Sequence, residues 1–264
     1  MSLTLGGGPL SARPPATVNY RLERPEHALF MHPFPRRVRA ERGGRTVLDT
    51  ERGLLLHETR LLPVLYAPVE DFDRSLLRDS DHTTHCPYKG DAVYRTLAAG
   101  ESVFPDAVWS YPEPRAEAAW LSGLAAMYWD AADAWYDEDE RVRGHLRDPY
   151  HRVDVRRSAR RVRVSLGDAV VALTDRPRVL SETGLPNRLY VPRGDVRDGV
   201  LVPGATRAYC PYKGEAAYFG VRLDGRELAD AAWCFPDPLK DGLDVRDHVC
   251  FLHDELTTEV EPRP

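Results

Sequence analysis

A cysteine and a lysine stand three residues apart in a segment that favours a tight turn. Cys86 and Lys89 enclose Pro87 and Tyr88, and Gly90 follows directly. Proline and glycine are typical turn residues, so the turn could place the lysine ammonium beside the thiol. A nearby cation lowers the pKa of a thiol, and the thiolate is the form that acts as a nucleophile or is oxidised. The segment is therefore a candidate for thiol chemistry.

Two histidines come just before this segment. His82 and His85 could supply a general base, or together with Cys86 a three-ligand metal set. The candidates for catalysis are thus Cys86, Lys89, His82 and His85.

The same segment occurs a second time, as residues 210–214, and the residues on both sides of it also repeat at an offset of 124 positions without a gap. Such self-similarity over about a hundred residues predicts two copies of one domain and not a short solenoid repeat. The histidine positions read Thr206 and Tyr209 in the second copy, so any histidine chemistry is confined to the first.

Repeated polar residues within apolar stretches indicate a pocket in each copy. Glu58 and Glu182 need partners if they are buried, and Lys89 and Lys213 are the candidates. The residues predicted to bind a ligand are Glu58, Tyr66, Tyr88, Trp109, Glu182, Tyr190, Cys210, Lys213 and Trp233.

A purely structural interpretation of the same residues stays open. In it, Pro87 and Gly90 form the turn, Cys86 packs inward, Tyr88 covers the sheet and Lys89 pairs with an acid such as Glu58. The repeated tyrosines and tryptophans then belong to the core and do not stack on a ligand.

Composition excludes several classes of protein. The chain of 264 residues has a net charge of -5 and no strongly basic stretch, which argues against nucleic-acid and membrane-surface binding. We find no signal peptide and no apolar run long enough to span a membrane, so we expect a cytoplasmic protein. None of the four cysteines lies in a Cys-x-x-Cys pair, which argues against disulfides and zinc knuckles. We predict neither a metal nor a cofactor.

Local patterns predict a mainly β protein with short helical segments. Apolar alternation around turn residues predicts hairpins centred on Gly43-Gly44, Gly167-Asp168 and Asp224-Gly225. Residues 54–57 and 61–66 are predicted as strands. Asp71 is a predicted cap of a helical turn that ends near Leu77, and residues 116–127 have a helical composition.

The predicted domain organisation has four parts. Residues 1–30 form a partly disordered leader, 31–140 the first repeat domain, 141–160 an ordered linker and 161–264 the second repeat domain. The linker contains His145, Asp148, Tyr150 and His151, and we expect it to dock by salt bridges and not to carry out catalysis.

The repeated motifs resemble those of the domain-of-unknown-function 427 family. The resemblance rests on Glu182-Thr183-Gly184, Tyr190-Val191-Pro192, the Cys-Pro-Tyr-Lys-Gly segments and Ala232-Trp233 with Pro236 and Pro238, together with their first-copy counterparts. It implies two tandem β-tent-like domains, similar to the ligand-binding domain of cereblon. Proteins with that architecture hold zinc through paired Cys-x-x-Cys motifs, which are missing from this chain. The family is also labelled nucleotidyltransferase-like, but no Gly-rich phosphate loop or paired-carboxylate metal motif supports that activity here.

Three functions are compatible with the sequence. The first is small-molecule binding in a pocket lined by the repeated Glu, Tyr, Cys and Lys set, with Cys86 as the nucleophile if the protein is an enzyme. The second is a non-catalytic scaffold with a pseudo-two-fold body, whether monomer or homodimer. The third is metal binding through His82, His85 and Cys86. No substrate or reaction class follows from the residues.

Overall fold

The computed structural model describes residue 4, residues 11–13 and residues 25–261. They fall into two compact units, divided between Tyr150 and His151. Both units are mainly β, as the sequence predicted. Most of the expected leader lies outside the described residues, but its last residues belong to unit 1, because the first strand already begins at Leu29. The first unit therefore starts earlier than residue 31.

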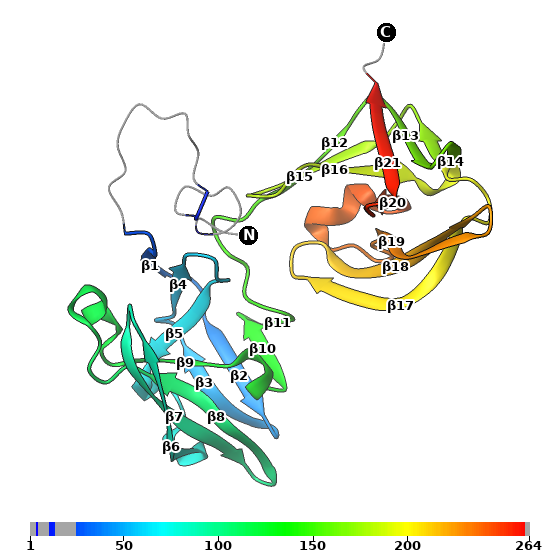
Figure 1. Cartoon of the computed structure of the whole chain (residues 1–264). Helices are drawn as coiled ribbons and strands as arrows, with labels where there is room; N and C mark the ends of the chain where they lie inside the picture. The colour runs from blue at the N-terminus through cyan, green and yellow to red at the C-terminus, as the bar shows by residue number, and fades with distance from the viewer. Residues whose placement is uncertain (1–3, 5–10, 14–24, 262–264) are drawn as a thin grey trace. The chain divides into compact units, whose positions relative to one another are not determined.

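Unit 1 consists of a seven-stranded and a four-stranded antiparallel sheet (Figure 1). The large sheet has the order β1 (Leu29–Pro33), β4 (Leu54–Glu58), β5 (Val64–Pro68), β9 (Leu124–Met127), β8 (Ser102–Ser110), β7 (Gly90–Ala99) and β6 (Leu77–Cys86). The small sheet has the order β11 (Glu140–Val142), β10 (Ala134–Asp137), β2 (Val38–Arg42) and β3 (Arg45–Thr50).

Unit 2 repeats this plan (Figure 1). Its large sheet has the order β12 (Val153–Arg157), β15 (Arg178–Glu182), β16 (Arg188–Pro192), β20 (His248–Phe251), β19 (Arg226–Cys234), β18 (Gly214–Leu223) and β17 (Leu201–Cys210). Its small sheet has the order β14 (Ala169–Thr174), β13 (Arg161–Leu166) and β21 (Leu256–Glu261). The two large sheets have the same strand order, and the small sheets differ only in β11, which has no counterpart among the described residues of unit 2. This common plan is the structural form of the duplication.

The predicted hairpins are confirmed, and their turns explain why. Gly43 and Gly44, between β2 and β3, both have positive φ, as do Asp224 and Gly225 between β18 and β19. Two successive residues with positive φ form the tight turn whose twist matches that of the strands. Glycine adopts this backbone without steric strain, which is why these dipeptides mark hairpins in the sequence.

The duplication is not free of gaps, in contrast to the prediction. Trp135 on β10 pairs with Ala40, whereas Thr258 on β21 pairs with Val164. Ala40 and Val164 are 124 positions apart, but Trp135 and Thr258 are separated by only 123. Unit 2 is therefore one residue shorter before its last strand. Sequence identity is low in that stretch, so the shift was not visible.

Two local helix predictions need correction. Asp71 does not cap the turn that ends near Leu77; the cap is Asp73, whose side chain accepts from the backbone N of Ser75 ahead of the 3-10 helix η2 (Arg74–Leu76). Asp71 instead accepts from Thr50 Oγ1 at 2.7 Å and also binds Arg52. Residues 116–127 form a 3-10 helix, η3 (Ala116–Leu121), and then strand β9, so most of the stretch is not helical in the expected way. Of the residues predicted as a strand over 61–66, only 64–66 belong to β5.

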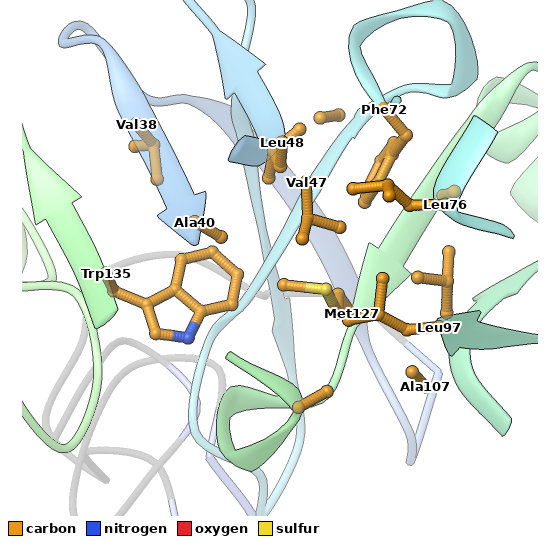
Figure 2. Packing of buried hydrophobic residues seen from close by; sticks show 14 of the residues in the cluster. Val38, Ala40, Val47, Leu48, Phe72, Leu76, Leu97, Ala107, Met127 and Trp135 are labelled. Atoms are coloured by element: carbon orange, nitrogen blue, oxygen red, sulfur yellow. The ribbon is translucent and has the colours of Figure 1, made fainter. Parts of the chain in front are cut away.

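The central strands of the large sheet of unit 1 are buried on both faces. One face packs against the small sheet around Val38, Val47, Leu48 and Trp135 (Figure 2). The other face carries Leu56 and the aromatic residues Tyr66, Tyr94 and Tyr111, and it is covered by Ala118 and Leu121 of η3. Because side chains alternate along a strand, each central strand supplies residues to both faces. The candidate site lies on the second of these faces.

The predicted linker residues extend the folds of the units. β11 begins at Glu140 and reaches into this stretch, and β12 lies within it. Inside unit 1, the Tyr150 hydroxyl lies 2.8 Å from His32 Nδ1, and the Asp148 carboxylate lies 3.9 Å from His57 Nδ1. His57 is fully buried, and neither of its ring nitrogens has a hydrogen-bond partner among the described residues.

The burial of His57 makes unit 1 sensitive to acid. Burial lowers the pKa of His57, opposed by the negative charge of Asp148 and reinforced by His32. Because the folded pKa lies below the unfolded value of about 6.5, stability is complete above that pH and is lost as the pH falls below it. We predict that unfolding by urea, followed by tryptophan fluorescence, shows this loss between pH 7.5 and 5.5, with a slope of at most about 1.4 kcal/mol per pH unit.

The control for this prediction is His57→Phe, which keeps a ring at the position and removes the titration. Four of the five tryptophans, Trp109, Trp120, Trp129 and Trp135, lie in unit 1, so the fluorescence reports mainly this unit. An equal pH dependence in both proteins would contradict the assignment to His57.

Candidate functional site

The predicted partnership of Glu58 and Lys89 is present in the structure and includes a third member. Lys89 Nζ donates to Glu58 Oε2 at 2.5 Å, and His27 Nε2 lies 2.8 Å from Glu58 Oε1. Both carboxylate oxygens therefore have a nitrogen partner. Glu58 and Lys89 are buried, which is tolerable for charged groups only when they are paired and hydrogen-bonded.

Unit 2 contains the same three-residue cluster. Lys213 Nζ donates to Glu182 Oε2, and His151 Nε2 lies 3.0 Å from Glu182 Oε1. We call these two sets the Glu–Lys–His clusters: His27, Glu58 and Lys89 in unit 1, and His151, Glu182 and Lys213 in unit 2.

The backbone around each cluster fixes its members. Glu58 is the last residue of β4, and the next hydroxyl, Thr59 Oγ1, accepts from Ala28 N at 3.0 Å. This bond holds the chain that carries His27. In unit 2, Thr183 Oγ1 accepts from Arg152 N at 2.9 Å and holds the chain that carries His151. The histidines are thus positioned by the residue after each glutamate.

The Cys-Pro-Tyr-Lys-Gly turn positions the lysine. It joins β6 to β7, with Lys89 N donating to Cys86 O at 3.3 Å. Gly90 has a φ of 104°, and a Cβ atom there would lie 3.2 Å from Glu113 O. The turn therefore requires glycine, and Arg115 N donates to Lys89 O at 3.0 Å to close it. The counterparts Gly214 and Leu239 repeat both features in unit 2.

His27 and His151 were missed as site residues. They are separated by 124 positions, the offset of the duplication, so the repeat itself held the signal. His27 falls in the expected leader, and His151 belongs to the linker, which is expected only to dock by salt bridges.

The turn tyrosine differs between the units. Tyr88 stacks on His27, with ring centroids 3.9 Å apart, and is 43% exposed. Its counterpart Tyr212 has its ring centroid 4.1 Å from that of His151 and is only 3% exposed. The tyrosine that contacts the histidine is thus exposed to solvent in unit 1 and buried in unit 2.

Tyr66 and Trp109 form a hydrogen-bonded pair beside the cluster. Trp109 Nε1 donates to the Tyr66 hydroxyl at 3.1 Å, and Trp233 Nε1 donates to Tyr190 at the same distance. Burial raises the pKa of both tyrosines. Their hydroxyls therefore stay protonated and keep a proton to donate at neutral pH.

The two repeated cysteines are free thiols of intermediate exposure. Cys86 packs against the apolar cluster around Leu56 and Tyr66, as the structural interpretation expected. The ammonium of Lys89 binds Glu58. Cys250 is buried, and burial raises the pKa of its thiol to about 12, while Cys234 is half-buried.

The structure does not bring the two predicted histidines into a metal set with Cys86. His85 is exposed and its Nδ1 lies 2.5 Å from Asp91 Oδ1, whereas His82 packs on Tyr94 with ring centroids 4.6 Å apart. In the described part of the chain, no group of three His, Cys, Asp or Glu side chains is placed to hold a metal ion.

A cavity of about 460 Å³ lies beside the unit 1 cluster. Glu58, Lys89 and Tyr66 line it, and Cys86 does not. The remaining walls are mostly apolar or aromatic and include Tyr94, Trp109, Tyr111, Tyr128, Trp129, Leu61 and Leu62. Of the residues predicted to bind a ligand in the first copy, Glu58, Tyr66 and Trp109 therefore share one cavity, and Tyr88 is outside its lining.

Several lining positions have different residues in unit 2. At the offset of 124, Val64 corresponds to Arg188, Tyr128 to Leu252 and Trp129 to His253. The correspondence at Tyr128 is structural, because Tyr128 N donates to Ala107 O and Leu252 N donates to Ala231 O. Unit 2 keeps its charged cluster but loses part of the aromatic wall.

The cluster in unit 2 predicts an unusually acidic glutamate. Burial raises the pKa of Glu182, but the hydrogen bond from His151 and the charge and hydrogen bond of Lys213 outweigh it, so that the pKa falls to about 2. A folded pKa below the unfolded value stabilises the protein above about pH 4.5, and this stabilisation, roughly 3 kcal/mol, is lost as the pH falls towards 2. We predict that carbon NMR of the Glu182 carboxyl shows no titration above pH 3.

The control for the NMR assignment is Glu182→Gln, whose spectrum lacks the signal and whose stability falls less between pH 5 and 3. A Glu182 carboxyl that titrates near pH 4.3, the ordinary glutamate value, would refute the paired arrangement.

Comparisons with known proteins agree with the repeat. The model of one family, described as a domain of unknown function (DUF427), matches residues 30–138 and again residues 154–262. A search of curated proteins gave no match. No helix in the described residues is long and apolar enough to cross a membrane. Since the two matches cover most of the sequence, the chain belongs to the DUF427 family as a tandem two-copy member.

Proposed function

We propose that unit 1 binds a small molecule with an apolar, aromatic body and at least one hydrogen-bond acceptor. The observation that supports this most directly is the cavity of about 460 Å³, whose walls combine aromatic rings with the polar groups of Tyr66 and Lys89. Its size is within the range of small-molecule sites, about 300–1,000 Å³, and a mainly apolar lining with few polar groups is typical of them.

The aromatic walls favour a flat ligand. Trp109 and Tyr128 pack together with ring centroids 4.6 Å apart, and Trp129 stacks on Trp135 at 4.6 Å. Aromatic rings prefer to contact other rings in offset or edge arrangements, which contribute about 0.5–1.5 kcal/mol beyond the buried area. A planar ring is therefore better suited to this cavity than a flexible chain.

The polar groups favour a ligand with an acceptor and no strong charge. Lys89 is neutralised by Glu58, so the cavity has no free charge to attract a polyanion. Tyr66 accepts from Trp109 and retains its own O–H, while Lys89 has N–H groups beyond the one given to Glu58. A carbonyl or ring nitrogen would satisfy these donors. Because a nucleotide is a polyanion, the lack of a free positive charge in the cavity also argues against nucleotide transfer.

Binding has more support than thiol catalysis. Cys86 does not line the cavity, and the Lys89 ammonium interacts with Glu58. The scaffold alternative fits unit 2 better, because Tyr212 is buried there and its cluster is closed. We therefore assign binding to unit 1 and a structural or interaction role to unit 2.

The test is a thermal-shift screen of aromatic carbonyl and heteroaromatic compounds, since a ligand that binds the native state raises its melting temperature. For each hit, we predict that Tyr66→Phe and Tyr128→Ala each weaken the affinity about three- to tenfold, by loss of a donor or a ring contact. Isothermal titration calorimetry measures the change.

The matched controls are Tyr190→Phe and Leu252→Ala, the same positions in unit 2, which should leave the affinity unchanged. Cys86→Ser should also bind as well as the wild type. A site in the unit 1 cavity would be contradicted if the unit 2 substitutions weakened the affinity as much as the unit 1 substitutions. It would also be contradicted if none of the four substitutions changed the affinity.

A further inference from the structure

A second cavity of unit 1 lies on the face of the large sheet that packs against the small sheet. It has a volume of about 320 Å³ and is lined by Val69, Phe72, Arg74, Leu77, Asp79, Arg95, Val108 and Ala125. Along β7 and β8, the alternation of side chains places neighbouring residues in different cavities. Tyr94 and Trp109 line the first, while their neighbours Arg95 and Val108 line the second.

The floor of the second cavity is apolar and belongs to the core. Val108 and Ala125 are each 1% exposed, and Phe72 reaches in from the segment before η2 (Figure 2). The apolar side chains that a ligand could contact are mainly Val69 and Leu77, which are partly buried against this core.

The mouth of the second cavity is cationic. It contains the guanidinium groups of Arg74 and Arg95 and one carboxylate, that of Asp79. Arg95 contacts Asp79 at 3.4 Å and Ser110 Oγ at 3.3 Å, both long distances, and the Asp79 side chain is 95% exposed. Arg74 has no ion pair within the described part of the chain. The two guanidinium groups thus have N–H donors available for a ligand. With two cations and one carboxylate, the mouth has a net positive charge.

Unit 2 fills the same place with its own side chains. Arg74, Asp79 and Arg95 correspond to Asp198, Pro203 and Phe219 at the offset of 124, and Val69 corresponds to Arg193. The Arg193 guanidinium lies 5.0 Å from the centroid of the Phe219 ring. A cation thus lies over an aromatic ring within unit 2, whereas in unit 1 these two positions are Val69 and Arg95.

We propose that this second cavity of unit 1 binds a small monocarboxylate with an apolar tail. The tail packs against Val69 and Leu77, above the buried Phe72 and Val108, and the carboxylate accepts hydrogen bonds from Arg95 and Arg74. Arginine suits this role because its planar guanidinium matches the geometry of a carboxylate. The site is separate from the proposed aromatic site and uses none of its residues.

The experiment compares octanoate with octanamide, which has the same length but no charge, by isothermal titration calorimetry on the full chain. Octanoate should bind and octanamide should bind at least tenfold more weakly. Arg95→Gln and Arg74→Gln should each weaken octanoate binding by about tenfold, through loss of a charge-assisted hydrogen bond. Arg74 is on the surface, so its substitution leaves the fold intact.

Two further variants locate the site. Val69→Arg introduces into unit 1 the arginine that unit 2 has at this position, Arg193, and should abolish octanoate binding. Tyr128→Ala, in the aromatic cavity, should leave octanoate binding unchanged. The proposal is overturned if octanoate does not bind, if octanamide binds equally well, if binding survives the Arg95 and Arg74 substitutions, or if Tyr128→Ala removes it.

Discussion

A buried carboxylate that must be neutralised determines the organisation of each unit. Glu58 and Glu182 end equivalent strands, and each has a lysine on one oxygen and a histidine on the other. Burial of an unpaired carboxylate would cost several kcal/mol, so these partners have to be held in place. The lysine is positioned by a turn that requires glycine. The histidine is positioned by the threonine directly after the glutamate, which accepts a hydrogen bond from the backbone of the residue after the histidine. The ion pairs of the glutamate thus join three segments of each unit that are far apart in the sequence.

The two units use this common framework differently. In unit 1, the cluster borders an aromatic cavity and Tyr88 is exposed, whereas in unit 2 Tyr212 is buried and several wall positions carry other residues. On the other face of the sheet, unit 1 has an open cationic cavity where unit 2 has Arg193 packed over Phe219. The two copies share the Glu–Lys–His cluster and differ in the residues around it. These differences are the reason for proposing ligand binding for unit 1 and not for both units.

Much of the fold could be predicted because its signals are local. The hairpin turns, the strands and the repeat follow from neighbouring residues, and the pairing of Glu58 with Lys89 follows from the cost of burying a charge. The role of His27 could not be predicted so easily, because it lies 31 residues from Glu58 and outside the expected domain. Asp73 replaced Asp71 as a cap because Asp71 is engaged by Thr50 and Arg52, a tertiary contact that local propensity does not contain. The cavity depends on side chains from many strands, and its shape is beyond any local pattern.

The most direct test of this account is a double-mutant cycle in each unit, with the free energy of unfolding measured by urea. The pairs are Glu58→Gln with Lys89→Met, and Glu182→Gln with Lys213→Met. Each lysine substitution should destabilise its unit by about 3–5 kcal/mol, because it leaves a buried carboxylate with one partner fewer. The double variants should lose much less than the sum, with a coupling of at least about 2 kcal/mol in both units. Additive effects, with a coupling below about 0.5 kcal/mol in either unit, would contradict the account.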